Sequence, residues 1–305
     1  MNGRGSEGLP TAPGPGAAAQ PPGRVLIAGC GYVGVALASQ LVTSGERVLA
    51  LRRGDAPLPE GVERFTADLG KPETLLGLPG DIDRVVYAAA PDASTTDGYR
   101  RTYVEGLRHL LAVVGTGPRL VFTSSTAVFA EDEGGVVDEE SPTATSGHPA
   151  ILLEAEALVR AAGGVCLRLG GIYGPGRDRM VRAVVSGTAR TPRAPRHGNR
   201  IHRDDAASAA AHLLRLPAPD PVYIGVDLDG ADLATLYAWV AGELGLPPPP
   251  LEDEDGTSGA RPSPHKRCTS AKLRASGWQP AYPTFREGYA HALQAARRAA
   301  QEAPR

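Results

Sequence analysis

A glycine-rich turn near the start of this sequence constrains the fold more than any other feature. The apolar run Val25–Ala28 leads without a gap into a Gly-x-Gly-x-x-Gly motif at residues 29–34, and residues 35–42 continue with helical periodicity. A second apolar run, Arg47–Leu51, follows the end of this helix. A strand, turn, helix and strand in this order hold the pyrophosphate of a dinucleotide at the helix N-terminus. The alternative is a tight turn in an α/β domain that binds no ligand.

The three glycines of the motif have separate roles. Gly29 permits the sharp turn out of the strand, Gly31 lets the backbone approach a pyrophosphate, and Gly34 lets the helix pack closely on the sheet. The unpaired N–H groups and the dipole at the start of the helix then face the anion. We therefore predict a cofactor-binding turn that consists of Gly29, Cys30, Gly31, Tyr32, Val33 and Gly34.

Composition narrows the possible partners. The chain has 305 residues and a formal net charge of −2, so nothing favours nucleic acid or an anionic membrane, and a small molecule is the expected partner. The three cysteines lie far apart without metal-like spacing, which predicts no metal site, no disulfide scaffold and a cytoplasmic location. Residues 1–23 are rich in Gly, Pro and Ala and lack the pattern of a signal peptide, so we expect a disordered tail there. No stretch of the sequence is apolar enough to predict a membrane span.

Short apolar runs alternate with helix-length segments, which predicts a parallel sheet with helices on both faces. The expected fold class is therefore α/β, a doubly wound (Rossmann) parallel sheet with a smaller C-terminal substrate lobe. The predicted strands are Val25–Ala28, Arg47–Leu51, Val62–Thr66, Arg84–Ala89, Arg119–Thr123, Val165–Leu169 and Val222–Val226. The predicted helices lie near residues 32–44, 99–115, 149–162, 203–216 and 232–244. The predicted domains are 24–170 for dinucleotide binding, 171–295 for a substrate lobe interleaved with the sheet, and 296–305 for a tail.

Ligands of such sheets bind beyond the carboxyl ends of the strands. Arg52 and Arg53 end the second predicted strand, where an NAD site usually has a carboxylate, and a guanidinium fork suits the 2′-phosphate of NADP. NADP is therefore favoured over NAD, and the alternative is a solvated strand end. After the third strand come Asp68 and Leu69, where the Asp68 carboxylate could accept a hydrogen bond from adenine or cap the loop.

Small and hydroxyl-bearing residues follow the next two strands. Ala88 and Ala89 leave room for a cofactor to lie flat against the backbone. Residues 123–126, Thr-Ser-Ser-Thr, place hydroxyls directly past a buried strand, where one of them can donate to a substrate carbonyl. The alternative for these serines is the capping of a turn.

Several motifs occur in the order found in a known family. They are the Gly-x-Gly-x-x-Gly turn, Ala67-Asp68-Leu69, Tyr103-Val104-Glu105-Gly106-Leu107, Ser124 to Phe129, Arg168 to Arg177 and Ile201 to Ala206. Over residues 24–290 the chain resembles the NAD-dependent epimerase/dehydratase family, the extended branch of the short-chain dehydrogenases/reductases. The portion from 266 to 289 is similar to the atypical subgroup that includes the bacterial YeeZ-like proteins. The resemblance implies NAD(P)-dependent oxidoreductase chemistry.

The resemblance also implies roles for individual residues. Ser125 matches the catalytic hydroxyl of the family. Tyr173 and Arg177 match the loop that borders cofactor and substrate, and His202 matches a substrate-side position that opens the following helix. We therefore predict Ser125 as a catalytic residue and the other three as substrate residues.

One functional pair of the family is absent. Family enzymes use Tyr-x-x-x-Lys, in which the lysine lowers the tyrosine pKa and the phenolate exchanges the proton that accompanies hydride transfer. No lysine of this sequence lies four residues after a tyrosine. If Glu156 matches the acidic residue that commonly follows the pair, His148 occupies the tyrosine position and Leu152 occupies the lysine position.

Three accounts of this gap are open, and we favour the first. In the first, the protein is an oxidoreductase for a small or sugar-like carbonyl or alcohol, with Ser125 holding the reacting oxygen and His148 as acid or base. In the second, the dinucleotide is bound without turnover, as a structural ligand or redox signal. In the third, the protein is a nucleotide-sugar epimerase or dehydratase. The helices near 99–115 and 149–162 resemble the pair through which family members dimerise, so we also expect a homodimer.

Overall fold

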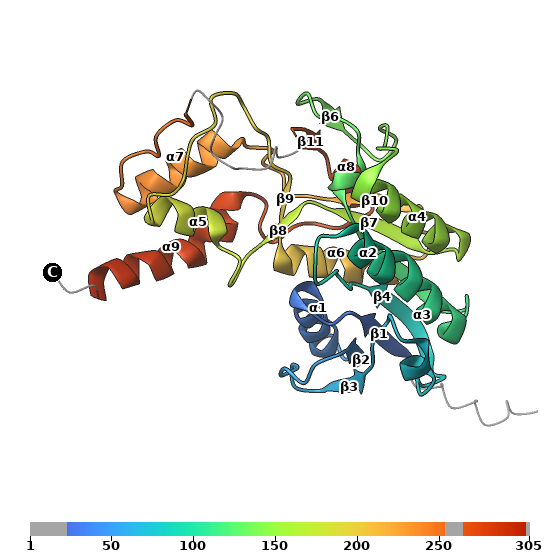
Figure 1. Cartoon of the computed structure of the whole chain (residues 1–305). Helices are drawn as coiled ribbons and strands as arrows, with labels where there is room; N and C mark the ends of the chain where they lie inside the picture. The colour runs from blue at the N-terminus through green and yellow to red at the C-terminus, as the bar shows by residue number, and fades with distance from the viewer. Residues whose placement is uncertain (1–22, 254–264, 303–305) are drawn as a thin grey trace, which may run out of the picture.

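The protein is built around a parallel sheet of seven strands. The computed structural model describes residues 23–253 and 265–302. The strands are β1 (Arg24–Ala28), β2 (Arg47–Arg52), β3 (Val62–Thr66), β4 (Ile82–Tyr87), β5 (Arg119–Ser125), β7 (Val165–Leu169) and β10 (Val222–Gly225). They lie in the order β10-β7-β5-β4-β1-β2-β3, each parallel to its neighbours (Figure 1). The predicted strands are confirmed, with small differences at their ends.

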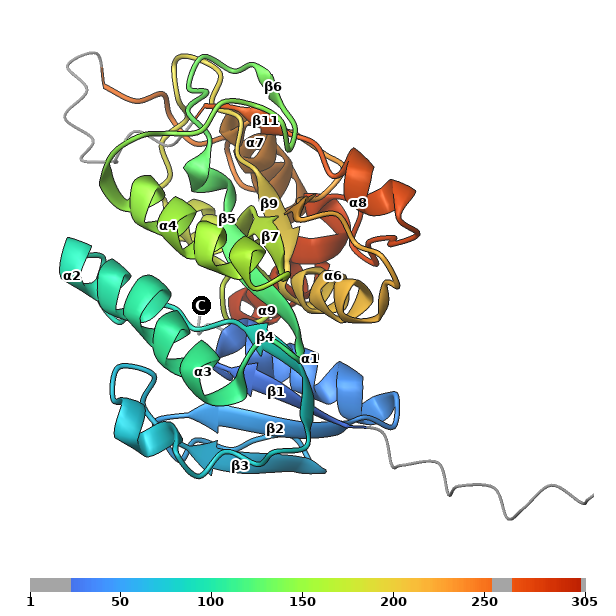
Figure 2. The ribbon, with the colours of Figure 1, turned by 90° about the vertical axis from the view of Figure 1, so that its right-hand side faces the viewer.

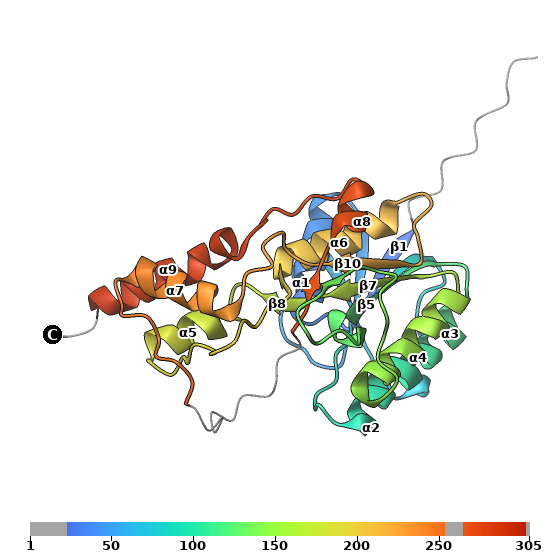
Figure 3. The ribbon, with the colours of Figure 1, turned by 90° about the horizontal axis from the view of Figure 1, so that it is seen from above.

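Helices cover both faces of this sheet. The main covering helices are α1 (Tyr32–Thr43), α3 (Gly106–Val114), α4 (Gly147–Ala161) and α6 (Arg203–Arg215). Alternate residues of β1 enter two different buried clusters, Leu26 and Ala28 on one face and Val25 and Ile27 on the other. Helices α3 and α4 pack on the first face, whereas α1 and α6 pack on the second (Figures 2 and 3). The doubly wound fold class is therefore confirmed.

The helix that leads into α3 contains a wider, π-helical turn. Helix α2 (Thr96–Tyr99) continues into η2 (Arg100–Glu105), which has π-helical geometry, and η2 continues into α3. The hydroxyl of buried Tyr87 donates to the carbonyl of Thr102 inside this turn, and a Cβ at Gly106 would lie 2.7 Å from the same hydroxyl. A side chain that inserts into the helical hydrogen bonds widens the turn. The sequence predicted the helix but not this widening.

Three further helices form a group of their own beside the sheet. They are α5 (Arg179–Val185), α7 (Leu233–Leu244) and α9 (Phe285–Glu302). Their shared core includes Val181, Leu236 and Phe285. Figure 3 shows the three helices together, far from α3 and α4. Helix α6 and strand β10 lie in the same half of the sequence but belong to the main sheet and its covering layer.

The last helix extends into the segment that was predicted as a tail. We expected a tail from residue 296, whereas α9 continues to Glu302. Leu293 is buried in the core of this helix group and Ala296 packs against that core, so the helix has an apolar face along which to continue. The tail expected at residues 1–23 lies outside the described residues, except for Gly23.

Short elements complete the fold. They are η1 (Pro72–Leu75), η3 (Thr126–Val128), α8 (Ala271–Ala275) and the strand pairs β8 (Gly171–Tyr173) with β9 (Arg200–His202) and β6 (Val136–Val137) with β11 (Arg267–Cys268). Within residues 23–253 and 265–302, no helix combines the length and apolar character that crossing a membrane requires. In the same ranges, no three His, Cys, Asp or Glu side chains come together in an arrangement that could hold a metal ion. The cytoplasmic location and the homodimer stay predictions.

Candidate cofactor and substrate site

A pocket of about 700 Å³, called the first pocket below, lies at the carboxyl ends of β1, β2, β4 and β5. It is lined by the predicted cofactor residues Gly29, Cys30, Gly31, Tyr32, Val33, Arg52, Arg53, Asp68, Leu69, Ala88 and Ala89. Gly34 is not part of the lining. A Cβ at Gly34 would lie 2.9 Å from the carbonyl oxygen of Gly29 and 3.1 Å from a methyl carbon of Ile27, so this glycine lets α1 pack closely on β1.

The glycine turn leaves room for a pyrophosphate. Gly31 is the N-cap of α1 and provides no side-chain cap, and a Cβ built on it would meet nothing within 4 Å. At Gly29, φ is +90° and a Cβ would lie 2.3 Å from the Ala89 backbone. Burial raises the pKa of the Cys30 thiol to about 11, so this side chain stays uncharged at neutral pH. A helix N-terminus with open space before it and an uncharged side chain beside it fits a phosphate group.

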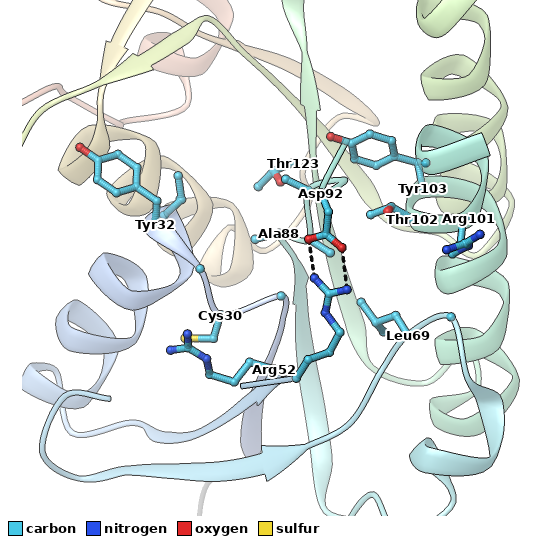
Figure 4. Close-up of a pocket in the computed structure, with 18 of the residues that line it drawn as sticks. Cys30, Tyr32, Arg52, Leu69, Ala88, Asp92, Arg101, Thr102, Tyr103 and Thr123 are labelled. Atoms are coloured by element: carbon cyan, nitrogen blue, oxygen red, sulfur yellow. Dashed lines mark hydrogen bonds and ion pairs between the residues drawn. The ribbon is translucent and has the colours of Figure 1, made fainter. Parts of the chain in front are cut away.

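An ion pair stands at the end of β2 (Figure 4). Arg53 donates two hydrogen bonds, 2.7 and 2.6 Å long, to the carboxylate of Asp92, which also lines the first pocket. These bonds hold the pKa of Asp92 below its usual value. Arg52 lies close to Cys30. A 2′-phosphate within reach of Arg53 would therefore have to compete with Asp92 for the guanidinium fork.

Asp68 shapes the loop that follows β3. One of its carboxylate oxygens accepts a hydrogen bond of 2.9 Å from the backbone N–H of Gly70. The Asp68 backbone N–H donates to the hydroxyl of Thr74 at 3.0 Å. The loop cap expected as one alternative is therefore present, and the residue also lines the first pocket. Its contact with adenine stays a prediction.

The hydroxyls at the end of β5 have different partners. Ser125 Oγ accepts a hydrogen bond of 3.1 Å from the Ala127 N–H and so caps η3. Ser124 Oγ donates to Glu156 at 2.7 Å, and Thr123 Oγ1 donates to the Tyr87 carbonyl at 3.2 Å. Because Ser125 is only an acceptor among the described residues, its own proton is left for a ligand.

A buried ion pair supports this end of the strand. Glu156 on α4 is 0% exposed and accepts hydrogen bonds of 3.0 Å from Arg168 Nε and 2.7 Å from Arg168 Nη2. Arg168 lies beside Ser124 in the register of β7 and β5. Its guanidinium also lies 4.8 Å from the centroid of the Phe129 ring. The pair therefore joins α4, β7 and β5 next to Ser125.

A second pocket of about 590 Å³ adjoins the first, and both are lined by Ser125, Ile172 and Arg177. Tyr173 lines this second pocket, as predicted for a substrate residue. The cationic residues of the lining are Arg177, Arg179, Arg182, Arg196, Arg200 and Lys266. None of the described residues that line it is Asp or Glu. Such a lining favours a negatively charged ligand.

Arg177 connects the loop at 174–177 to the glycine turn. Its guanidinium lies 4.1 Å from the centroid of the Tyr32 ring, a favourable cation–π geometry. The Tyr32 hydroxyl in turn donates to the Pro175 carbonyl at 2.9 Å. Arg177 therefore lies beside the glycine turn and lines both pockets, and its contact with a substrate stays a prediction.

His202 lies outside both pockets, although the sequence predicted it as a substrate residue. It is 2% exposed, and its Nδ1 accepts a hydrogen bond from the Asp204 N–H at 3.3 Å, which caps α6. Its ring centroid is 3.7 Å from that of Tyr282. Burial lowers its pKa, so it is held neutral. The structure therefore gives His202 a role in the core and does not bring it to the substrate side.

His148 is also absent from the lining of either pocket. It stands at the start of α4, where its ring stacks on Tyr99 with centroids 4.0 Å apart and planes 11° apart. Leu152, at the position where the family has lysine, is 3% exposed and packs in the core. The structure does not bring His148 to Ser125, so this geometry gives no support to its predicted acid–base role.

One wall of the first pocket could not be predicted from the sequence. It comes from the loop after β4, from α2 and from η2, and contains Asp92, Ala93, Thr95, Asp97, Gly98, Arg101, Thr102 and Tyr103. Tyr99, Tyr103 and Leu107 are spaced four residues apart, which is typical of the buried face of a regular helix and does not indicate that a side chain faces a pocket. The π-helical turn depends on a contact with Tyr87 on strand β4. The motif Tyr103-Val104-Glu105-Gly106-Leu107 marks this segment as part of the family pattern, but it does not indicate that the helix widens there.

Known proteins share this sequence pattern. Residues 25–225 match the model of the NAD dependent epimerase/dehydratase family. The chain is 28% identical over 242 residues to Protein YeeZ of Escherichia coli K12. The aligned region covers 74% of this chain and 85% of YeeZ. The chain is 29% identical over 215 residues to a 2-alkyl-3-oxoalkanoate reductase of Stenotrophomonas maltophilia, which covers 63% of this chain and 64% of that one.

A solved structure shares the fold as well. The structure from Methylobacillus flagellatus, described as an NAD-dependent epimerase/dehydratase, is similar over 91% of this chain and 100% of its own. Its sequence identity is 36% and its TM-score is 0.75. The family match, the relatives and the shared fold confirm the resemblance stated from the motifs. The chain belongs to the NAD-dependent epimerase/dehydratase family.

Proposed function

We propose that the protein is an NAD(P)-dependent oxidoreductase that acts on a small or sugar-like carbonyl or alcohol carrying a negative charge. The main support for this proposal is that Ser125 lines both pockets, together with Ile172 and Arg177. A hydroxyl at this boundary is placed to hold the oxygen of a substrate whose carbon faces the cofactor. The similarity to a reductase named for an oxoalkanoate supports the same class of chemistry.

The first pocket would hold the dinucleotide. The turn at Gly31 would take the pyrophosphate, Asp68 the adenine, and Ala88 and Ala89 the ribose side of the nicotinamide. When bound, this cofactor supplies or accepts a hydride. The protein contributes position, hydrogen bonds and the exclusion of water, and the Arg177 contact with Tyr32 keeps the loop at 174–177 against the turn.

The charge of the second pocket supports an anionic substrate. Arg196 and Arg182 are paired with Glu252 and Asp178, so they are partly neutralised. Arg200 lies near Asp227, whose pKa burial raises to about 8. Because Asp227 is then mostly protonated at neutral pH, it does not offset the charge of Arg200. A carboxylate or phosphate on the substrate would complement this surplus of positive charge.

Replacing Ser125 by alanine tests the position of the reacting oxygen. With a substrate found by screening oxo acids, neutral aldehydes and nucleotide sugars, Ser125→Ala is expected to lower kcat by about 100-fold. The Kd of the cofactor, measured by calorimetry, is expected to change by less than about twofold because the pyrophosphate site is untouched. Ser125→Thr keeps a hydroxyl and is the matched control. An unchanged kcat in Ser125→Ala would remove Ser125 from the chemistry, and a bound dinucleotide with no turnover of any compound would favour the non-catalytic account.

Arg53 and Asp92 provide a test of cofactor preference. Fluorescence titration of the parent is expected to show tighter binding of NADPH than of NADH, and Arg53→Ala is expected to reduce this preference about tenfold by removing the guanidinium fork. Asp92→Asn is expected to increase the preference, because the competing carboxylate is lost. Arg47→Ala, at the other end of β2 and paired with Asp81, should leave both affinities unchanged. Equal binding of NADPH and NADH by the parent would contradict the assignment of the 2′-phosphate to Arg53.

A further inference from the structure

The first pocket contains a tyrosine, Tyr103, although the Tyr-x-x-x-Lys pair of the family is absent from the sequence. Tyr103 lines this pocket together with Thr123 and Ser125. In Figure 4 it projects from the helix wall, and its hydroxyl points away from that helix toward the side of the pocket where Thr123 lies. The positions that handle the proton in the family hold His148, which stacks outside the pocket, and Leu152, which is buried in the core.

The π-helical turn accounts for the direction of Tyr103. Tyr103 lies within η2, directly after Thr102, whose carbonyl accepts the hydrogen bond from Tyr87. A side chain at position 106 would displace that hydroxyl, so Gly106 is needed for the insertion. Single π turns inside α-helices re-aim the side chains they carry and are frequent at functional sites.

Two aromatic rings hold the Tyr103 ring in place. The Phe122 ring lies 6.0 Å away at 89°, and the Tyr99 ring lies 5.4 Å away at 61°, both centroid distances in edge-to-face arrangements. Among the described residues, none forms a hydrogen bond with the Tyr103 hydroxyl. The phenol is thus fixed in orientation while its polar end is free to meet a ligand.

We infer that Tyr103 is the proton donor in the reduction of the substrate carbonyl, an inference that rests on the proposed function. A hydride from the reduced nicotinamide dinucleotide forms the new C–H bond, and the π electrons of the C=O bond move to oxygen. Tyr103 then transfers its phenolic proton to that oxygen, which is held by Ser125, and the product is the alcohol. The phenolate left on Tyr103 regains a proton from solvent.

The surroundings of Tyr103 favour reduction over oxidation. Burial raises the pKa of Tyr103 to about 12, and neighbouring Tyr99 raises it as well. The titratable groups on the packed elements include Tyr87, which is buried and uncharged, and His148 behind Tyr99. The charged side chains there include Asp97 on α2, Arg100, Arg101 and Glu105 on η2, and Glu154 and Glu156 on α4, where Glu154 pairs with Arg100 and Glu156 pairs with Arg168. At pH 7 the phenol can donate, whereas the phenolate required to oxidise an alcohol is present in about one molecule in 10⁵. The rate of reduction is therefore expected to be independent of pH between about pH 6 and 9. The rate of oxidation is expected to rise about tenfold per pH unit over the same range.

The kinetic test compares Tyr103→Phe with Tyr223→Phe. Loss of the phenol at 103 is expected to lower kcat for reduction by about 10²- to 10⁴-fold and to leave cofactor Kd within about twofold. It should also remove the pH dependence of oxidation. Tyr223→Phe removes a phenol on β10 whose oxygen accepts a hydrogen bond from the Asp220 N–H. Tyr223 lines neither pocket, so this variant is expected to retain the parent rates. A Tyr103→Phe enzyme with the kcat and pH profile of the parent would overturn the inference.

A second test does not depend on turnover. In protein labelled with [ζ-¹³C]tyrosine, the Tyr103 resonance is identified by its loss in Tyr103→Phe. Binding of NAD⁺ or NADP⁺ places a cationic ring near the phenol and is expected to lower the Tyr103 pKa, whereas ADP-ribose, which lacks nicotinamide, should leave it unchanged. If the cofactor binds and the Tyr103 resonance does not respond, the inference is wrong and the proposed function stands. If neither dinucleotide binds, both are wrong.

Discussion

The Gly31→Ala variant is expected to lose about 100-fold or more in dinucleotide affinity, about 2.7 kcal/mol, while its thermal stability stays that of the parent. Gly31 has φ of −97°, outside the left-handed region, and a Cβ there meets nothing within 4 Å of the protein. A methyl group therefore costs the fold little. It occupies the space through which a pyrophosphate would approach the N–H groups of α1. Calorimetric titration with NADH and NADPH and a thermal unfolding scan measure the two quantities.

Gly29→Ala is the matched control for this prediction. A Cβ at Gly29 would lie 2.3 Å from the Ala89 backbone, and φ of +90° is strained for alanine, so this variant should lose both affinity and thermal stability. The same added methyl group thus has different effects at two positions of one turn. If Gly31→Ala binds dinucleotide as tightly as the parent, the pyrophosphate does not lie at this turn and the proposed function loses its cofactor site.

Replacing Glu156 by alanine is expected to lower the free energy of unfolding by about 3–5 kcal/mol. Glu156 is 0% exposed and is the carboxylate that neutralises Arg168 and accepts from Ser124. Without it, the Arg168 guanidinium remains in the interior as an unpaired charge, and its Nη1 already has no hydrogen-bond partner among the described residues. Urea unfolding followed by circular dichroism measures the change.

Glu154 is the matched control on the same helix. It forms ion pairs with Arg100 and Arg108, and all three side chains are at least one-third exposed, with 35% for Glu154 itself. Water screens such pairs, so Glu154→Ala should cost no more than about 1 kcal/mol. A similar loss in both variants would show that helix α4 is simply sensitive to substitution, and a loss below about 1 kcal/mol in Glu156→Ala would contradict the role of the buried pair.

The strands and the glycine turn could be predicted because their signals are local. A strand buried on both faces needs a continuous apolar run, and Val25–Ala28 is such a run in any environment. The roles of Gly29, Gly31 and Gly34 follow from backbone stereochemistry over a few residues. The seven-stranded sheet and the residues of the first pocket at the turn therefore needed no knowledge of distant contacts.

The second half of the site depended on contacts that spacing cannot reveal. Arg53 meets Asp92 across two strands, and His202 turns into the core to cap α6. Arg53 stands at a strand end where a cofactor contact was predicted, and His202 stands where the family resemblance implies a substrate contact. A polar side chain at such a position can also find a partner within the protein. Only the folded chain selects between the two outcomes.

The amino-acid order alone was sufficient for the parallel sheet, the family and the conformation of the glycine turn, since each rests on periodicity, motif order or glycine conformations within short segments. Packing in three dimensions decided which hydroxyls face the pocket. Tyr103 lines the first pocket from the helical turn in which the Tyr87 hydroxyl donates to the Thr102 carbonyl. His148, in contrast, stacks on Tyr99 outside the pocket. The widening of the helix, which accompanies one hydrogen bond between Tyr87 and Thr102, cannot be predicted from sequence spacing because a regular helix would have the same residues in the same order.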